Sequence, residues 1–216
     1  MKKILLPITA CTLMFMSSCG GDHGHEHTEA SPETSEEICF YNYAEGTAAV
    51  RWTAFKTNDK IAVGGQFNTV NVTVGDKSTK ITDILETIKF NIPTKSTNTS
   101  NEDRDAKIVA SFFGAMDATD IILGQVKSAE GDNTAGTCTF YLTLNNVEKE
   151  VILNYTVAKD VVKLTGSIDL VDFKGEEAIA SLNKVCEALH VGSDGISKTW
   201  SNVDLEIEAS LNKDCH

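Results

Sequence analysis

The sequence predicts a mainly β protein whose antiparallel strands form either a closed barrel or a sandwich, with two short amphipathic helices added. Three observations support this prediction. Short segments rich in β-branched and aromatic residues recur from residue 46 onward, separated by turn-prone residues. Several of these segments alternate apolar and polar residues, as a sheet with one buried face requires. Two other segments repeat their apolar residues at helical spacing instead.

The clearest strand lies at 136–146, where Cys138, Phe140 and Leu142 alternate with polar residues. The next segment, 150–158, alternates in the same way, so the two should pair through a short turn. Such neighbours are typical of antiparallel sheets that close or stack on themselves. The expected strands are 47–55, 64–74, 83–93, 120–128, 136–146, 150–158, 161–171 and 202–211.

Two segments interrupt the strands with helical patterns. The first, at 100–116, begins with Ser100 and Asp103 at the spacing of a capping box. The second, at 175–192, has acidic residues in its first turn and a glycine at its end. Because each helix is apolar on one face only, we expect both to cover an end or a flank of the sheet.

The N-terminus has the pattern of an export signal. Two lysines precede an apolar run that is too short to span a bilayer, so residues 1–18 are predicted to be a signal peptide. Small residues before Cys19 resemble a bacterial lipobox, after which the cysteine is acylated and tethers the protein to a membrane. An ordinary secretory leader is the alternative. We expect an exported bacterial lipoprotein on the periplasmic side of the envelope or the cell surface, with the outer membrane favoured.

Residues 19–43 are predicted to join the acylated cysteine to the folded domain. This stretch is rich in Gly, Ser, Thr and Glu and has no apolar periodicity, which indicates a flexible linker. It contains His23, His25 and His27 at alternate positions, and imidazoles bind zinc, copper or nickel. A flexible tract offers no fixed geometry, so a polar spacer is favoured. A metal-handling or stress-response protein of the envelope is the alternative function.

The charge and the cysteines exclude some partners and suggest a compartment. A net charge of −12 disfavours nucleic acids and anionic lipid surfaces as partners. Outside the leader and Cys19, four cysteines remain, which allow three pairings and suit an oxidising compartment. Two disulfides are therefore expected among Cys39, Cys138, Cys186 and Cys215.

The sequence contains few groups suited to catalysis. Within the domain, no nucleophile motif, glycine-rich phosphate loop or zinc spacing is recognisable. Arg104 and Asp105 lie at the start of the first helix, where they either contact the head of a ligand or hold the corner, the second being favoured. His190 is expected to interact with the end of the second helix. An enzyme that uses these three residues is the weakest hypothesis, and no cofactor is expected.

Large apolar residues are distributed over all the expected strands and helices. They either fill a solid core or line a cavity for an apolar ligand, as in lipocalins, and the pattern alone leaves both open. The residues concerned are Trp52, Phe55, Phe67, Ile88, Phe90, Phe112, Phe113, Phe140, Leu142, Leu153, Tyr155, Phe173 and Trp200.

The order of several motifs resembles the YceI-like family of exported, lipocalin-like barrels that are associated with polyisoprenoid binding. The segments "VRWTAFK" and "GGQF" resemble its first hairpin, and "LTLNNVEKEVIL" a later one. The most specific block is "IKFNIPTKSTNTSNEDRDAKIVASFFGAMDATDI", with its Arg-Asp pair and Phe-Phe. The similarity covers residues 44–211. Two features depart from the family: Asn145-Asn146 replaces a common His-Gly turn, and a helix at 175–192 replaces a loop near the mouth.

This resemblance implies a single antiparallel barrel of about eight strands over residues 44–212. The barrel would hold a long apolar lipid, such as a polyisoprenoid, without being an enzyme, and a homodimer is compatible with it. In such a barrel the first and last strands are neighbours, which implies disulfides Cys39–Cys215 and Cys138–Cys186. The same arrangement places Arg104, Asp105 and both helices near one end.

Overall fold

The computed structural model describes residues 37–118 and 120–216. These residues belong to one compact unit, Glu37–His216. The expected signal peptide, Cys19 and the three linker histidines lie outside the described residues. Among the described helices, none is both long and apolar enough to cross a bilayer.

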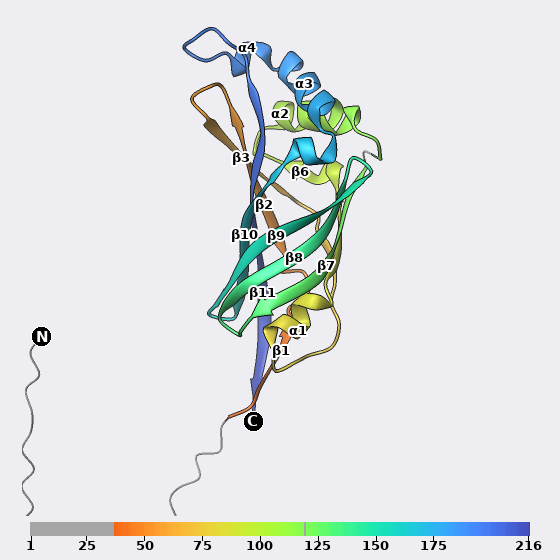
Figure 1. Ribbon diagram of the computed structural model, residues 1–216, viewed down its shortest axis with the longest axis vertical. Helices are drawn as coiled ribbons and strands as arrows, with labels where there is room; N and C mark the ends of the chain where they lie inside the picture. Colours follow the sequence, from red (N-terminus) through yellow and green to blue (C-terminus); the bar gives the residue numbers. More distant parts are fainter. Residues whose placement is uncertain (1–36, 119) are drawn as a thin grey trace, which may run out of the picture. The chain divides into compact units, whose positions relative to one another are not determined.

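The unit consists of strands and a few short helices, which confirms the mainly β fold (Figure 1). The strands are β1 Cys39–Tyr43, β2 Ala49–Lys56, β3 Ile61–Phe67, β4 Asn71–Thr73, β5 Lys89–Pro93, β6 Thr97–Asn98, β7 Ile121–Gly131, β8 Ala135–Leu144, β9 Val147–Ala158, β10 Val161–Asp169 and β11 Thr199–Cys215. The α-helices are α1 Ile81–Glu86, α2 Glu102–Lys107, α3 Glu176–Val185 and α4 Glu187–His190. Single turns add a π-helix at Ile108–Phe112 and 3-10 helices at Thr94–Ser96, Phe113–Ala115 and Leu170–Phe173.

All strands pair antiparallel in one curled sheet that forms a half-barrel. The strand order is β4-β5-β7-β8-β9-β10-β11-β2-β3-β6, and β1 pairs with the far end of β11. Sequential neighbours from β7 to β11 form a meander, and β11 then returns the chain to β2. The long β11 therefore joins both halves of the sheet and carries the first strand as well.

Within the described residues, eleven strands are present instead of the expected eight because three short strands, β1, β4 and β6, are added. The segment 64–74 divides into β3 and β4, and the small β6 adds two residues at the edge. The first strand, β1, begins at Cys39, inside the stretch that the sequence assigns to the linker. Its five residues do not alternate clearly between apolar and polar, and they form a strand because they pair with β11.

One expected strand begins as a helix. Residues 83–93 were expected to be extended throughout, but α1 occupies Ile81–Glu86 and only β5 is a strand. The apolar residues Ile81, Ile84 and Leu85 have the i, i+3, i+4 spacing of a helix and are all buried. The helical spacing begins at Ile81, which lies before the segment 83–93, so the pattern within that segment does not show it.

Both expected helices are present, with changes at their ends. The side chain of Asn101, rather than Ser100, accepts the capping hydrogen bond, from the Arg104 amide at 2.9 Å. The capping box predicted at Ser100 is therefore wrong. The second helix breaks at Cys186 into α3 and α4. Figure 1 shows α2, α3 and α4 together at one end of the unit and α1 with β1 at the other.

Glycines on the concave face accommodate large aromatic rings of neighbouring strands. Gly65 is paired with Trp52 across β2 and β3, and a Cβ atom at Gly65 would overlap the indole ring. Gly124 stands in the same relation to Phe90. At such positions a side chain and the opposing ring cannot occupy the same space.

We predict that Gly65→Val lowers the free energy of unfolding by about 1–3 kcal/mol, because the new side chain displaces the Trp52 ring. Gly64→Val is the matched control, since a Cβ atom there meets only the Trp52 carbonyl oxygen at 3.9 Å. Urea unfolding measures the stability, and Trp52 fluorescence reports the displaced ring. Equal stability losses in both variants would contradict the prediction.

Candidate ligand cavity

The concave face of the sheet encloses an apolar cavity of about 570 Å³. Side chains from both halves of the sheet line it, and α1, α2 and the α3–α4 segment contribute the rest. Cavities of 300–1,000 Å³ are typical of small-molecule sites. The interior is thus hollow between its two ends. The sequence left open whether the core is solid or hollow, and the structure shows a cavity.

Ten of the thirteen apolar residues singled out from the sequence line this cavity. They come from β2, β3, β5, β8 and β11 and from the segments flanking the helices. They are Trp52, Phe55, Phe67, Ile88, Phe90, Phe112, Phe113, Phe140, Leu142 and Trp200.

The other three, Leu153, Tyr155 and Phe173, do not line the cavity, so their assignment to it needs correction. Each is at most 2% exposed and packs in the solid part of the core. The Tyr155 hydroxyl donates to the carbonyl of Asp132 at 2.7 Å, and the ring lies against Gly136. Burial raises the pKa of Tyr155. Alternation predicts that such residues face inward, but it does not distinguish solid core from cavity wall.

Several lining residues are aliphatic and were not singled out. The largest set is on β11, where alternate residues from Val203 to Leu211 face the cavity. The alternation of these residues was sufficient to predict that they face the interior, because the sequence already assigned 202–211 to a strand. Ile81 and Ile84 were harder to find, since their segment was expected to be extended.

Apart from Tyr43 of β1, the polar lining residues belong to the end that carries α2, α3 and α4. Lys56 donates to the Leu189 carbonyl oxygen at 2.9 Å, and Lys107 lies on α2. Leu189 lines the cavity and is 60% exposed, so the cavity reaches the surface here. We call this opening the mouth. The polar side chains that line it are Lys56, Asn101, Asp103, Arg104, Lys107, His190 and Thr199.

His190 joins the second helix to β11 at the mouth. Its Nδ1 lies 2.8 Å from the Thr199 hydroxyl and 3.2 Å from the Asn183 side-chain oxygen. Burial, and then the nearby Lys56 ammonium, lower the pKa of the imidazole. The lowered pKa favours the neutral imidazole, and Nδ1 is held in a network with Asn183 and Thr199.

Arg104 and Asp105 both bind Thr99, which is buried in the loop before α2. The Arg104 guanidinium donates to the hydroxyl and the carbonyl oxygen of Thr99, each at 2.8 Å. Asp105 accepts from the Thr99 amide at 2.8 Å and from its hydroxyl. These bonds close the corner, as favoured from the sequence. Arg104 also lines the cavity, whereas Asp105 does not.

We predict that Asp105→Ala lowers the free energy of unfolding by about 1.5–3 kcal/mol, because the buried amide of Thr99 loses a charged acceptor. Asp103→Ala, two residues away at an exposed position, should change stability by less than about 0.5 kcal/mol. Thermal unfolding of both variants measures the difference. A larger loss at Asp103 would show that helix charge, rather than the corner, dominates here.

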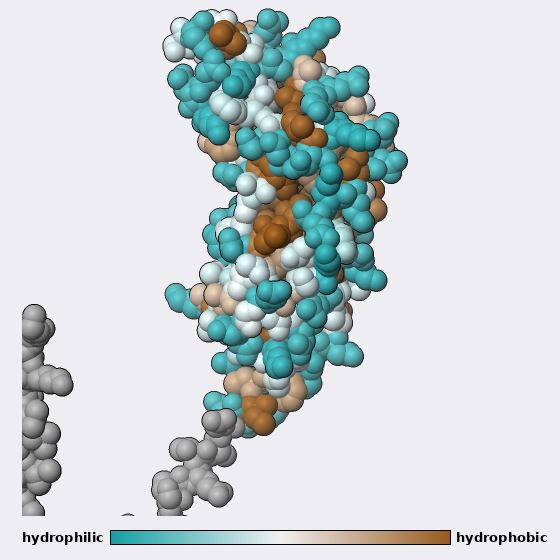
Figure 2. Space-filling view, viewed as in Figure 1, coloured by the Kyte–Doolittle hydropathy of each residue, from teal (hydrophilic) through white to brown (hydrophobic). Residues whose placement is uncertain are grey.

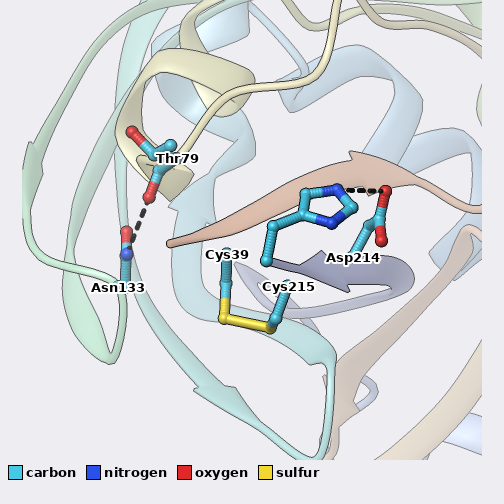
Figure 3. The surroundings of a disulfide bond; sticks show 6 residues. Cys39, Thr79, Asn133, Asp214 and Cys215 are labelled. Carbon is cyan, nitrogen blue, oxygen red and sulfur yellow. Dashed lines mark hydrogen bonds and ion pairs between the residues drawn. A yellow bond between two sulfur atoms is a disulfide. The ribbon is translucent and has the colours of Figure 1, made fainter. Parts of the chain in front are cut away.

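The cysteines form one of the two expected disulfides. Cys39 and Cys215 are bonded, joining the start of β1 to the end of β11 (Figure 3). Glu37 approaches this pair, but two sulfurs shared in a disulfide provide no thiolate for a metal ion. The expected Cys138–Cys186 bond is wrong, because both residues are free and buried.

The free cysteines belong to different ends of the fold. Cys138 lies on β8, where burial and then Glu86 of α1 raise the pKa of its thiol to about 12. Cys186 separates α3 from α4 at the opposite end and lines the cavity. The prediction failed because it placed the second helix over the wrong part of β8.

Comparisons with known proteins show relatives of this fold. A polyisoprenoid binding domain from Saccharophagus degradans, implicated in plant cell wall breakdown, aligns with a TM-score of 0.57 at 12% identity, covering 82% of this chain and 99% of that one. BcnA from Burkholderia cenocepacia aligns with the same score at 14% identity, over 79% and 99% of the two chains. The YceI protein of Campylobacter jejuni is 25% identical, with a TM-score of 0.45 and coverage of 68% and 84%.

No curated protein matches the chain significantly. The family model for the YceI-like domain matches residues 41–211, nearly all of the compact unit. The match includes the Arg-Asp corner, the cavity walls and most of the helical end. The chain therefore belongs to the YceI-like family.

Proposed function

We propose that this protein binds a long apolar lipid, of the polyisoprenoid type or similar, inside the half-barrel and carries or sequesters it without catalysis. The observation that carries this proposal is the apolar cavity of about 570 Å³ on the concave face of the sheet. The binding described for the Saccharophagus degradans domain supports the ligand class.

The chemistry of the walls favours a ligand with a long apolar part and a small polar end. Each methylene group moved from water into such a cavity contributes about 0.8 kcal/mol, so chain length alone provides affinity. Polar lining groups occur at the mouth, where Lys56 and Lys107 are next to the opening. We therefore place the polar end of the ligand at the mouth and its chain toward α1.

Native mass spectrometry of the protein purified without detergent tests the proposal. We expect an adduct that organic extraction releases, and the emptied protein should then take up geranylgeraniol from ethanol. Uptake is followed through the fluorescence of Trp52 and Trp200, which both line the cavity. A protein that carries no lipid and takes up none of the offered isoprenoid would refute the proposal.

We also propose that the protein acts outside the cytoplasm, tethered to a bacterial membrane by an acylated Cys19. The lipobox-like pattern around this residue supports the tether. Cells fed labelled palmitate should incorporate it into the wild-type chain but not into Cys19→Ala. Labelling of both chains, or of neither, would argue against the tether.

A further inference from the structure

We propose that the end of the fold beside the mouth docks on a zwitterionic phospholipid surface, so that lipid passes between bilayer and cavity without crossing water. The docking surface, here called the loop tip, consists of residues 57–61, from the β2–β3 turn to the first residue of β3, and residues 189–198, from the end of α4 to the start of β11. The route for lipid rests on the proposed function, whereas the docking itself does not.

The loop tip is a single structural unit. The Thr57 amide donates to the Lys198 carbonyl oxygen at 2.9 Å, and the Trp200 indole donates to the Thr57 carbonyl oxygen at 2.6 Å. A side-chain hydrogen bond also joins Asn58 to Asp194. Figure 1 shows the hairpin and the loop at the same end of the unit.

Large apolar side chains are exposed on this unit. Ile61, Leu189, Val191 and Ile196 are between 43% and 60% exposed. They account for four of the ten large apolar residues exposed within the described part of the chain. Figure 2 shows hydrophobic surface on the loop that follows α4. Exposed apolar side chains gathered in this way mark an interaction surface.

The surface continues into the cavity. Leu189 belongs to the loop tip and also lines the cavity, and Phe55 and Trp200 line it just behind. A ligand that leaves through the mouth therefore passes apolar side chains of the loop tip as well as the polar groups of the mouth. This continuity favours a lipid surface over an unrelated protein partner, because the ligand itself comes from such a surface.

The charged groups of the loop tip suit a layer of lipid phosphates. Lys198 lies 3.5 Å and Lys60 4.4 Å above the Trp200 ring, and neither forms an ion pair within residues 37–118 and 120–216. Lysine and tryptophan together are typical of protein segments at the membrane–water interface. Acidic residues nearby offset the lysines, so a zwitterionic surface suits this otherwise acidic chain better than an anionic one. They are Asp59, Glu187 and Asp194.

A second copy of the chain is a poorer occupant. A stable interface between copies buries roughly 1,000 Å² or more. The four exposed apolar side chains of the loop tip fall short of this area. Shallow insertion into a bilayer requires no such area, since apolar side chains and an aromatic anchor suffice.

Quenching of Trp200 by brominated lipid tests the docking in the full-length chain. In a Trp52→Phe background Trp200 is the sole tryptophan. Its fluorescence therefore reports contact between the loop tip and the bilayer, even if the N-terminal residues also bind the vesicles. Vesicles of phosphatidylcholine are compared with vesicles of the same lipid brominated on its acyl chains. We expect the brominated vesicles to lower the emission at least twofold.

The double variant Val191→Asp/Ile196→Asp, at two exposed residues of the loop tip that do not line the cavity, should lose this quenching. Ile152→Asp is the matched control, because Ile152 is 65% exposed on β9, away from the loop tip. Circular dichroism checks that all variants are folded. Unchanged Trp200 emission in the parent, or equal quenching in the double variant, would overturn the proposal. So would quenching that persists after the vesicles are removed, since this indicates lipid taken into the cavity.

Two further measurements separate the alternatives. Sedimentation velocity without vesicles detects dimers. If the parent forms a dimer that the double variant does not form, and the parent shows no quenching, the loop tip binds a second copy of the chain. That outcome would overturn the proposal. Geranylgeraniol delivered from ethanol should bind the double variant as well as the parent. If quenching occurs but no isoprenoid binds, the proposed function fails while the docking stands.

Discussion

Replacing Ala54 by tryptophan is expected to weaken isoprenoid binding more than 100-fold and to leave the fold intact. Ala54 is a small residue in the middle of β2 that lines the cavity, opposite Val63 of β3 and Val203 of β11. An indole there excludes about four methylene groups of a ligand, each contributing about 0.8 kcal/mol. The sum of about 3 kcal/mol corresponds to the stated loss. Native mass spectrometry with geranylgeraniol measures it.

Thr53→Trp is the matched control for this experiment. Thr53 is the preceding residue of β2 and faces the outer side of the sheet, beside Arg51 and Glu206. The same indole there should leave isoprenoid binding within about twofold of the wild type. If both variants bind as the wild type does, the ligand does not occupy the half-barrel.

Removing the disulfide is expected to have the largest effect on stability. The double variant Cys39→Ser/Cys215→Ser should lower the free energy of unfolding by about 2–5 kcal/mol. The bond links residues 176 positions apart, so it restricts the unfolded chain strongly. It also holds β1, whose five residues pair with β11 and which otherwise forms a single bridge among the described residues, between Tyr41 and Ser78. Urea unfolding of the variant and the wild type measures the change.

Cys186→Ser serves as the control, because this cysteine is free. Dithiothreitol should destabilise the wild type and the Cys186→Ser protein by the same amount and leave the double variant unaffected. Destabilisation of the double variant by dithiothreitol would show that a second disulfide contributes in solution.

The sequence was informative wherever a local pattern decides the structure. Strict alternation located β8 and β9, and the family resemblance located the corner at Arg104 and the pair Cys39–Cys215. The corner was read as structural because acidic residues surround Arg104. The structure shows that Arg104 holds the corner through hydrogen bonds to Thr99, and no spacing in the sequence reveals this partner.

The failures have a common cause. Tyr155 and Phe140 have the same inward alternation, yet only Phe140 lines the cavity, because Gly136 lets the Tyr155 ring pack against the sheet. The barrel implied by the resemblance led to an expected Cys138–Cys186 bond, but these two residues lie at different ends of the fold. Both errors concern distance along the barrel axis. Period-two patterns record which face a residue occupies but not its height on that face.

The sequence by itself determined that this protein is an antiparallel β protein with an apolar interior, and its motifs indicated the YceI-like family. Only the tertiary structure decided that the interior is hollow, that the cavity opens beside α4, and that exposed apolar residues of two distant segments meet there. The physical reason is that alternation and spacing are local, whereas a cavity and a surface arise from side chains that the strand pairing brings together across the whole chain.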